Sequence, residues 1–298
     1  MLTRIDAPAL PAGRGLTVIV NPSSGPSDSD ELVAQIRHAL PAATILEPDD
    51  PDDVDARLRE HAPGATAIGI VGGDGSVSGA AAVAADAGKP LVVVPGGTLN
   101  HFARDLGVET VAGVARAVEK GEAVAVQRGL VDGRTFLNTA SFATYPQLVD
   151  AREALEHRVG KWPALAVALA RVLRRENAID VEIDGYAARI WVAFVGNGMY
   201  EPAGLAPRRR ASLDDGVLDV RLVNAHGRWA RTRVIGAALV GRVPRCRAFD
   251  RRVVKELRVR CLAGALRLAA DGETFDGGDD VLIRLAPEPL ALYSPVAG

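Results

Sequence analysis

A short apolar run that ends in glycines, an aspartate and a serine is the feature that most constrains the fold of this chain. Residues 67–71 predict a buried strand, and the alanine-rich residues 77–87 predict the helix that follows it. The connection between them is Gly72-Gly73-Asp74-Gly75-Ser76. A glycine-rich strand-to-helix turn brings backbone N–H groups and a helix N-terminus against an anion. The alternative is a tight turn with a helix cap, and this turn alone leaves the two equally open.

Two further apolar runs end in loops of similar composition. Residues 16–20 lead into Asn21-Pro22-Ser23-Ser24-Gly25, and residues 91–94 lead into the loop 95–100. Continuous Val and Ile runs favour a parallel sheet covered on both faces, where ligands bind beyond the carboxyl ends of the strands. Three such loops at one edge predict a nucleotide phosphate site. The rest of this half is expected to form a short strand at 43–46 and helices at 30–40, 52–60 and 111–120.

The second half of the chain has a different pattern, because strand-like segments recur with turns between them. Two helices are expected to interrupt these strands, one over 146–174 and one over 229–240. The sequence thus predicts an α/β domain over 1–124, to which 287–298 can return, and a mostly antiparallel β domain over 125–286. The expected strands of the second domain span 124–131, 179–183, 189–195, 217–223, 256–260, 266–270 and 281–285.

Composition and cysteine content narrow the class of protein. The chain has 298 residues, of which 48% are hydrophobic, so it can build two cores of ordinary size. No apolar run reaches the ~18 residues expected of a membrane span. The first 15 residues lack the basic start and apolar centre of a secretory signal. Cys246 and Cys261 form no CxxC pair, and a reduced, cytoplasmic protein is expected.

Charge is distributed unevenly along the chain. Residues 1–150 carry 11 basic and 19 acidic side chains, whereas residues 151–260 carry 22 basic and 12 acidic ones. A basic face can contact nucleic acid or an anionic membrane surface. Few aromatic residues stand among these arginines, which argues against single-stranded nucleic acid. We expect peripheral contact with an anionic membrane and no nucleic-acid partner. A solvated arginine-rich surface remains the alternative. A homodimer is compatible with the sequence, although no segment indicates one.

The motifs together resemble the diacylglycerol kinase catalytic-domain family, which includes bacterial lipid kinases related to sphingosine kinases. The family motifs NPxSG, GGDGT and PxGTxNDFAR are matched by residues 21–25, 72–76 and 95–104. The similarity continues in order through most of the chain. The further matching segments are Asn138–Ser141, Gly196–Gly198, Asp215–Val220 and Asp271–Glu273.

The resemblance implies an NAD-kinase-like first domain that binds ATP. ATP is expected to lie against the loops of the first domain, between the two domains. By resemblance, Asn21, Pro22, Ser23, Ser24 and Gly25 would contact the nucleotide. Gly72, Gly73, Asp74, Gly75 and Ser76 would contact its phosphates. Thr98 would contact a phosphate or the ribose, and Asn100 belongs to the same predicted binding set.

The resemblance also implies which carboxylates perform the chemistry. Glu273 would be the general base that takes the proton from a lipid hydroxyl, and Asp271 would lie in the same site and orient that group or a metal. Asp74 is the third predicted catalytic residue. A hydroxyl nucleophile needs a carboxylate within hydrogen-bond reach. Without the resemblance, Asp271-Gly272 would be read as an ordinary hairpin turn.

A structural magnesium site is a further implication of the resemblance. The Asp215 carboxylate, with backbone carbonyl groups near Ser212 and Val217, would hold Mg²⁺, a cation that prefers oxygen ligands. A turn that carries Asp214-Asp215-Gly216 is an equally good interpretation of the sequence alone.

The chain departs from the family pattern at three positions. Ser76 replaces a threonine but keeps the hydroxyl group, whereas Gly79 and His101 replace a glutamate and an aspartate. The sequence therefore predicts a kinase that uses ATP and Mg²⁺ to phosphorylate a lipid hydroxyl. Two alternatives remain: a kinase with a soluble substrate, such as an NAD kinase, and a catalytically weak protein that binds lipid or nucleotide.

Overall fold

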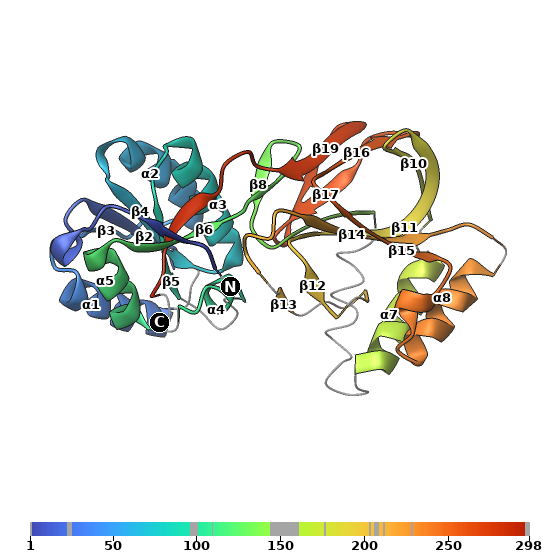
Figure 1. Ribbon diagram of the computed structural model, residues 1–298, viewed down its shortest axis with the longest axis horizontal. Coiled ribbons are helices and arrows are strands. Elements are labelled where there is room, and N and C mark those ends of the chain that lie inside the picture. Colours follow the sequence, from blue (N-terminus) through green and yellow to red (C-terminus); the bar gives the residue numbers. More distant parts are fainter. Residues whose placement is uncertain are drawn as a thin grey trace. The chain divides into compact units, whose positions relative to one another are not determined.

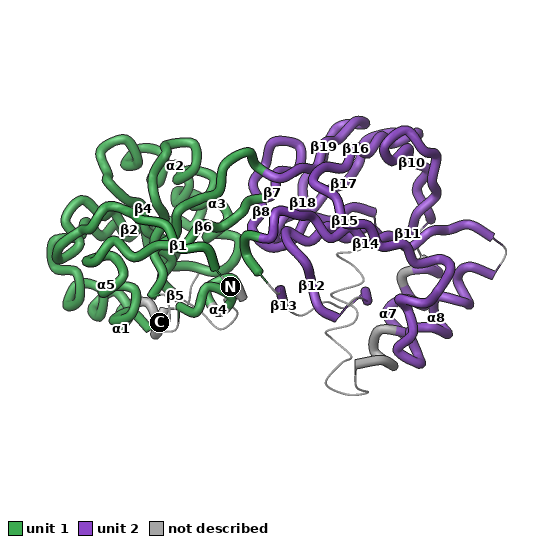
Figure 2. The backbone as a smooth tube through the Cα atoms, in the orientation of Figure 1, with its two compact units in different colours: residues 1–128, 212–214, 286–298 green, residues 129–211, 215–285 purple. Residues whose placement is uncertain are grey.

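The computed structural model contains two compact units (Figures 1 and 2). The first consists of Met1–Arg128, Ser212–Asp214 and Ala286–Gly298, and the second of Gly129–Ala211 and Asp215–Leu285. The C-terminal segment therefore returns to the unit in which the chain begins. The structure describes residues 2–22, 26–95, 101–108, 110–143, 161–175, 177–202, 204–205, 209–210, 212–227 and 229–295.

The first unit is built on a seven-stranded sheet whose central strands run parallel. Its strand β20 pairs in parallel with β5 and antiparallel with β6, so the edge formed by β6 and β1 is antiparallel. The Val- and Ile-rich strands β2, β4 and β5 are buried, as expected for a sheet covered on both faces. In order across the sheet, the strands are β1 (Arg4–Asp6), β6 (Glu122–Val126), β20 (Leu290–Tyr293), β5 (Leu91–Pro95), β4 (Ala67–Gly72), β2 (Leu16–Val20) and β3 (Thr44–Leu46).

Helices cover both faces of this sheet, with α2 and α3 on one side and α1 and α5 on the other (Figure 1). Thr110 caps α5, because its side chain accepts a hydrogen bond from the Gly113 N–H at 3.1 Å. Gly121, with φ 72°, ends that helix in the left-handed conformation. The helices are α1 (Pro26–Ala39), α2 (Val54–His61), α3 (Asp74–Asp86), α4 (His101–Asp105) and α5 (Val111–Lys120), with single 3₁₀ turns at Pro11–Gly13, Pro51–Asp53 and Ala62–Gly64.

An eleven-stranded sheet forms the second unit, and each of its strand pairs is antiparallel. The main path across the sheet is β18 (Glu273–Asp276), β17 (Arg267–Ala270), β9 (Thr139–Ala143), β11 (Tyr186–Asn197), β10 (Ile179–Ile183), β16 (Glu256–Cys261), β19 (Asp280–Leu285), β7 (Gly129–Val131) and β8 (Arg134–Phe136). β14 (Leu218–Asn224) pairs with β11 and β15 (Phe249–Val254), while β12 (Tyr200–Glu201) and β13 (Arg209–Arg210) form a separate pair.

Two hydrophobic clusters stabilise the second unit. One lies among the strands and includes Phe142, Val195 and Val220. The other packs α7 (Lys161–Arg175) and α8 (Ala230–Leu239) against the sheet through residues such as Leu169 and Val234. The two helices lie side by side in Figure 1, and a 3₁₀ turn, Val243–Arg245, follows α8. Among the described residues, no helix is long and apolar enough to cross a membrane.

The predicted fold class is confirmed: the first unit is α/β with a parallel central sheet, and the second is an antiparallel β unit with two helices among its described residues. The expected strand 124–131 proves to be two strands, because Gln127 and Arg128 separate β6 from β7. The helix expected over 146–174 is observed as α7 from Lys161, and residues 144–160 lie outside the described part. The strands that the sequence did not predict are β1, β8, β9, β12, β13, β15, β18 and β20.

Candidate active site

The predicted loops of the first unit begin at one edge of its sheet. Val20 is paired with Val71 and Gly72 with Pro95, so β2, β4 and β5 end next to one another. Because all three strands run in the same direction, the segments after them leave from the same side. The structure therefore brings Asn21 and the Gly72–Ser76 turn together, as the sequence predicted.

Asn21 and Ser76 are joined directly at this edge. The Asn21 Nδ2 donates a hydrogen bond of 2.6 Å to the Ser76 Oγ. Gly72 lies beside this pair, and a Cβ added to it would lie 2.7 Å from the Ser76 Cβ and 3.4 Å from the Asn21 Cβ. A glycine is therefore required where β4 turns into α3. This turn keeps the end of β4 close to the first residues of α3.

Helix α3 begins two residues after the end of β4, so its N-terminus lies at the same edge of the sheet. Gly73 precedes the helix, exposed and in an extended conformation, and Asp74 and Gly75 are its first residues. The N–H groups of a first helical turn have no partner within the helix, and they favour an anion. Backbone donors, a helix N-terminus and the Ser76 hydroxyl group together form a cradle suited to phosphate.

Asp74 connects this cradle to the next helix. Its Oδ1 accepts a hydrogen bond of 3.2 Å from the backbone N–H of Phe102, a buried residue in the first turn of α4. The carboxylate is half-buried and fixes the start of α4, which begins at His101. Asp74, the third predicted catalytic residue, therefore connects the start of α3 to the start of α4. Pro22 is half-buried beside Asn21, while Ser23, Ser24, Gly25, Thr98 and Asn100 lie outside the described residues.

Gly79, where the family motif has glutamate, faces a carboxylate from another helix. The Oδ1 of Asp55, on α2, lies 2.6 Å from the position that a Cβ on Gly79 would take. The missing side chain therefore leaves space that Asp55 enters. The sequence did not predict this approach, because Asp55 belongs to no motif and lies in a different helix.

A hydrogen-bonded turn organises the predicted catalytic residues of the second unit. The Asp271 carboxylate accepts three backbone hydrogen bonds, from Leu137 at 2.7 Å and from Asn138 and Thr139 at 2.8 Å. The Asp271 N–H donates in return to the Thr139 carbonyl at 2.8 Å. The hairpin that joins β17 to β18 is thereby fixed to the start of β9.

The motif residue Asn197 and Arg210, which belongs to no motif, also bind this turn. Asn197 and Arg210 both donate to the Leu137 carbonyl, at 2.8 Å and 2.6 Å. Arg210 also donates to the side chain of Asn138 at 3.2 Å. Asn197 is fully buried and Arg210 nearly so. These polar groups form one connected network, in which burial strengthens each hydrogen bond.

Glu273 lies two residues beyond Asp271 and has a different environment. Asp271 has φ 46° and Gly272 φ 94°, which forms a tight hairpin turn. Glu273 begins β18 and is exposed, and its carboxylate has no hydrogen bond or ion pair within the part of the chain that the structure describes. The Asp271 carboxylate is therefore held by backbone donors, whereas Glu273 is exposed.

Asp215 has one carboxylate oxygen with a partner and one without. Its Oδ2 accepts from the Met199 N–H at 2.9 Å, while its Oδ1 is buried and has no hydrogen-bond partner in the described structure. The Val217 carbonyl accepts from the Gly198 N–H at 2.9 Å. Ser212 belongs to the first unit, where its hydroxyl group donates to Asp214 at 2.5 Å.

A buried ion cluster supports the same region of the second unit. Asp219 and Arg221 are fully buried and lie 2.6 Å apart, and Arg251 adds a contact of 2.8 Å to Asp219. Burial alone would raise the pKa of Asp219, but hydrogen bonds from Arg251 and Arg221 outweigh it, and the pKa lies below its ordinary value. Arg221 also donates to the carbonyl groups of Tyr200, Pro202 and Gly204. Asp219 lies in the matching segment Asp215–Val220, but nothing in the sequence indicates its part in this ion cluster.

Comparison with known proteins agrees with these motifs. A family model described as "Diacylglycerol kinase catalytic domain" matches residues 15–131, and one described as "YegS C-terminal NAD kinase beta sandwich-like domain" matches residues 147–294. A "Probable lipid kinase YegS-like" protein of Pseudomonas aeruginosa is 30% identical over 233 residues, which cover 75% of each chain. The chain belongs to the diacylglycerol kinase catalytic-domain family.

Other relatives of this family member cover more of its length. A protein of Mycobacterium tuberculosis named "Diacylglycerol kinase" is 26% identical over 280 residues, which cover 87% of this chain and 88% of the relative. A crystal structure of a putative diacylglycerol kinase from Bacillus anthracis superposes with a TM-score of 0.69 at 23% identity, covering 95% of this chain and 97% of that one. The structural likeness shows that the two proteins share a fold. The family and its named relatives support kinase activity, and a kinase family implies the use of ATP.

Proposed function

We propose that this protein transfers the γ-phosphate of ATP to a hydroxyl group of diacylglycerol or a related lipid. The observation that carries the proposal is the cradle at the carboxyl edge of the first sheet. There Gly72 leaves no space for a side chain, Asn21 is bonded to Ser76, and α3 begins. Such a cradle suits a nucleotide phosphate. Ser23, Ser24, Gly25, Thr98 and Asn100 remain part of the predicted nucleotide set.

Glu273 is the proposed general base. In the proposed step its carboxylate accepts the proton of the lipid hydroxyl group, and the lipid oxygen forms a bond to the γ-phosphorus. The bond between that phosphorus and the oxygen of the β-phosphate breaks, and ADP leaves with the electron pair. Asp271 acts through the backbone: by holding Leu137, Asn138 and Thr139 it fixes the hairpin that carries Glu273.

Asp215 is the residue whose chemistry fits a bound cation. A buried carboxylate oxygen without a donor, such as its Oδ1, is stabilised by a hard cation such as Mg²⁺. The carbonyl groups of Val217 and Ser212 are the other ligands predicted from the sequence. No cluster of three or more acidic, His or Cys side chains occurs among the described residues. The proposed site therefore depends on backbone oxygens and water. Mg²⁺ bound at this structural site would neutralise the Asp215 carboxylate, whereas the Mg²⁺ that neutralises the transferred phosphoryl group would come with ATP.

The proposal is tested by transfer of labelled γ-phosphate from Mg-ATP in mixed micelles. The acceptors are diacylglycerol, monoacylglycerol, ceramide and sphingosine, with NAD as a soluble acceptor. Wild type should label one lipid class, and Glu273→Gln should lower the rate by at least a hundredfold, because it removes the base. The matched control is Glu256→Gln, an equally simple loss of one exposed carboxylate on β16.

Each other outcome selects a different function. Labelling of NAD but no lipid would replace the proposal with a soluble-substrate kinase. If ATP binds but no acceptor is labelled, the proposal fails in favour of a nucleotide-binding protein, consistent with Gly79 and His101. An unchanged rate in Glu273→Gln would overturn the assignment of the base.

A further inference from the structure

Arg134 is a cation beside the hairpin that carries Glu273. It begins β8, it is exposed, and its guanidinium carbon lies 4.2 Å from the centre of the Phe275 ring. Among the described residues, its guanidinium group has no hydrogen bond and no carboxylate partner. The proposed reaction step gives this cation no role. We therefore asked of its position which group of a substrate it would meet.

The register of the β17–β18 hairpin places Glu273 and Phe275 on the same face of the sheet. In this antiparallel pair Glu273 lies opposite Ala270, and Phe275 lies opposite Leu268. Alternate residues of a strand point to the same side, and directly opposed residues share a face. Leu268 belongs to the hydrophobic cluster among the strands, and Ala270 and Phe275 pack against that cluster. Glu273 therefore continues this face next to the hairpin turn.

Arg134 approaches the same face from a segment that the Asp271 network already holds. Phe136, two residues further along β8, is fully buried in the same cluster, so the two residues share one side of their strand. Residues 137–139, which follow, are those whose N–H groups bind the Asp271 carboxylate. The network that fixes the Glu273 hairpin therefore also fixes the end of the strand that carries Arg134.

The charged groups of Arg134 and Glu273 are neighbours that do not pair with each other. Glu273 and Phe275 are two residues apart, which is about 7 Å along a strand, and the guanidinium group lies over the Phe275 ring. In the described structure Glu273 and Arg134 nevertheless form no ion pair with each other or with another group. A single substrate can therefore donate a hydroxyl proton to Glu273 and present an anionic oxygen to Arg134.

The transferred phosphoryl group is the anion that the reaction brings beside the acceptor hydroxyl group. In the proposed step Glu273 takes the hydroxyl proton and the lipid oxygen bonds to the γ-phosphorus. The bond from that phosphorus to the β-phosphate oxygen breaks, and its electron pair leaves with ADP. The three other oxygens of the phosphoryl group carry negative charge throughout. A guanidinium group presents paired N–H donors that match two of these oxygens.

We propose that Arg134 binds the phosphoryl group during its transfer and the phosphate of the lipid product afterwards. Arg134 donates hydrogen bonds to the phosphoryl oxygens and transfers no proton, while the Phe275 ring holds its guanidinium group in position. This proposal rests on the proposed function, because it takes Glu273 as the group that meets the acceptor hydroxyl. The competing role is a structural one, in which Arg134 only covers the Phe275 ring.

Turnover of Mg-ATP and the lipid acceptor separates the two roles. Arg134→Ala should lower kcat about a hundredfold and leave the KM for the lipid unchanged, because the unphosphorylated lipid carries no anion for the guanidinium group. Arg134→Met keeps an apolar stem over Phe275 without the charge, and it should be equally slow. Methylguanidine in solution should restore part of the rate of Arg134→Ala, since it can occupy the vacated position.

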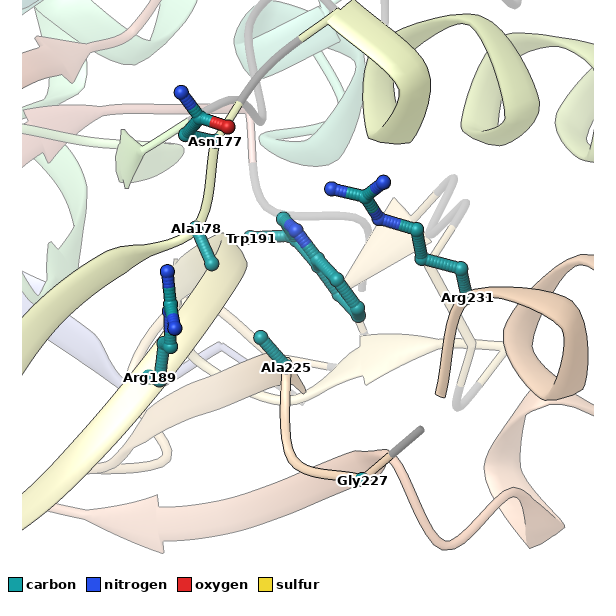
Figure 3. A pocket seen from close by; sticks show the side chains of 7 residues that line it. All are labelled: Asn177, Ala178, Arg189, Trp191, Ala225, Gly227 and Arg231. Atoms are coloured by element: carbon teal, nitrogen blue, oxygen red, sulfur yellow. The ribbon is translucent and has the colours of Figure 1, made fainter. Parts of the chain in front are cut away.

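Two other arginines provide matched controls. Arg267 lies on the opposite face of the same hairpin, 3.3 Å from Asp276. Arg231 is exposed like Arg134, and its guanidinium carbon lies 5.4 Å from the centre of the Trp191 ring. Both line a cavity of about 300 Å³ (Figure 3), and Trp191 belongs to the cluster that packs α7 and α8. Arg267→Ala and Arg231→Ala should keep the wild-type rate, with or without methylguanidine.

A binding measurement tests Arg134 without turnover. The phosphate ester of dioctanoylglycerol should bind to wild type, and Arg134→Ala should weaken that affinity about tenfold. The affinity for dioctanoylglycerol itself should not change, because it has no phosphate. Arg134→Lys, which keeps the charge but loses the paired donors, should have an intermediate affinity for the ester. Isothermal titration in the absence of ATP measures both ligands.

The results distinguish failure of this inference from failure of the proposed function. If Glu273→Gln loses the rate but Arg134→Ala or Arg134→Met keeps it, the kinase stands and Arg134 is a structural cover for Phe275. If wild type labels no lipid but Arg134→Ala still loses affinity for the ester, the phosphate site stands and the kinase fails. An affinity for the ester that is equal in wild type and Arg134→Ala would overturn the phosphate site.

Discussion

The two halves of the predicted active site are assembled in different ways. In the first unit, Asn21 and Ser76 meet because each follows a strand of one parallel sheet. In the second unit, Asp271 binds the backbone of Leu137, 134 positions away, across an antiparallel sheet. The first arrangement depends on a strand edge and glycine-rich turns, whereas the second depends on a closed network of buried polar groups.

This difference has a consequence for stability. Loop side chains at a sheet edge can change with little effect on the core, because few other groups depend on them. A buried polar network is strongly stabilising only when every member has its partner. We therefore expect mutations in the second unit to affect folding and activity together, and those in the first unit to affect nucleotide binding more than folding.

The largest effect is expected for Asp219→Asn. This change leaves Arg221 fully buried without a counter-charge, and should reduce the free energy of unfolding of the second unit by about 3–5 kcal/mol. Urea unfolding followed by tryptophan fluorescence measures it, because Trp162, Trp191 and Trp229 all lie in the second unit.

Asp250→Asn is the control for this prediction. Asp250 is partly exposed and paired with Arg252 at 2.8 Å, so its loss should cost less than about 1 kcal/mol. Equal losses in the two variants would show that the Asp219 cluster is no more important than a surface pair. If Asp219→Asn does not fold, Arg251→Met removes the more exposed partner and should give an intermediate loss.

The pH dependence of stability should reflect the same cluster. The folded-state pKa of Asp219 is lowered, so its contribution to stability is complete above its ordinary value of 3.8 and is lost as the pH falls through the lower, folded-state pKa. The unfolding free energy of wild type should therefore decrease below about pH 4. Asp219→Asn should show a flatter profile in that range. Parallel profiles would contradict the lowered pKa.

Asp271→Ala should cost about 2–3 kcal/mol, because three backbone N–H groups lose their acceptor. Part of any loss comes from the positive φ of 46°, which alanine tolerates less well. Asp132→Ala isolates that part: Asp132 has φ 50°, also precedes a glycine in a hairpin, and its carboxylate has no hydrogen bond among the described residues. Unfolding in urea measures both variants.

The two alanine variants also differ in activity. Asp271→Ala should lower kcat for the lipid without changing the KM for ATP, because it releases the hairpin of Glu273 and leaves the first unit intact. Asp132→Ala should keep the wild-type rate. If Asp271→Ala loses no more stability than Asp132→Ala, the Asp271 carboxylate contributes no more than that of an ordinary turn residue.

The strands of the first unit, and the sheet edge at which its predicted loops begin, could be read from the sequence because their signals are local. Apolar strands followed directly by glycine-rich loops specify both the sheet and the edge at which ligands bind. The strand β15 was missed, because Arg251 and Arg252 hide its alternation and were interpreted as part of a basic surface. Arg251 lies on β15 and pairs with Asp219, which explains an arginine within this strand. No pattern in the neighbouring sequence indicates that pairing.

The same reasoning explains the other omissions. The Asp-Gly turn at 271–272 predicts a hairpin, yet which backbone the carboxylate binds depends on strand pairing far along the chain. The approach of Asp55 to Gly79 depends on how α2 packs on α3. Local motifs identify the residue types of this site, whereas long-range packing decides which carboxylates remain available for chemistry.

A smaller effect is expected where Asn21 meets Ser76. Ser76→Ala removes a hydrogen bond of 2.6 Å and should cost about 1 kcal/mol, whereas Ser76→Thr, which restores the family residue, should keep it. A double-mutant cycle with Asn21→Ala measures the coupling free energy from unfolding and from ATP affinity. Coupling near zero in both would show that the contact does not organise the cradle.

The smallest effect is expected for Gly79→Ala in α3. Removing a glycine from a helix interior stabilises a protein by about 0.5–1 kcal/mol, but the new Cβ would lie 2.6 Å from the Asp55 Oδ1. Because Asp55 is exposed, its carboxylate can turn toward solvent, and we expect a net gain of about 0.5 kcal/mol in thermal or urea unfolding.

Asp55→Ala provides the control. In the double variant the new Cβ at position 79 meets no carboxylate, so the full stabilisation of about 0.5–1 kcal/mol from removing the glycine should be measured. If Gly79→Ala instead destabilises the first unit and Asp55→Ala rescues it, the Asp55 carboxylate is held in place rather than free to turn. The first unit would then also contain a polar side chain, that of Asp55, held in place by long-range packing. The two units would differ only in how many such groups they contain.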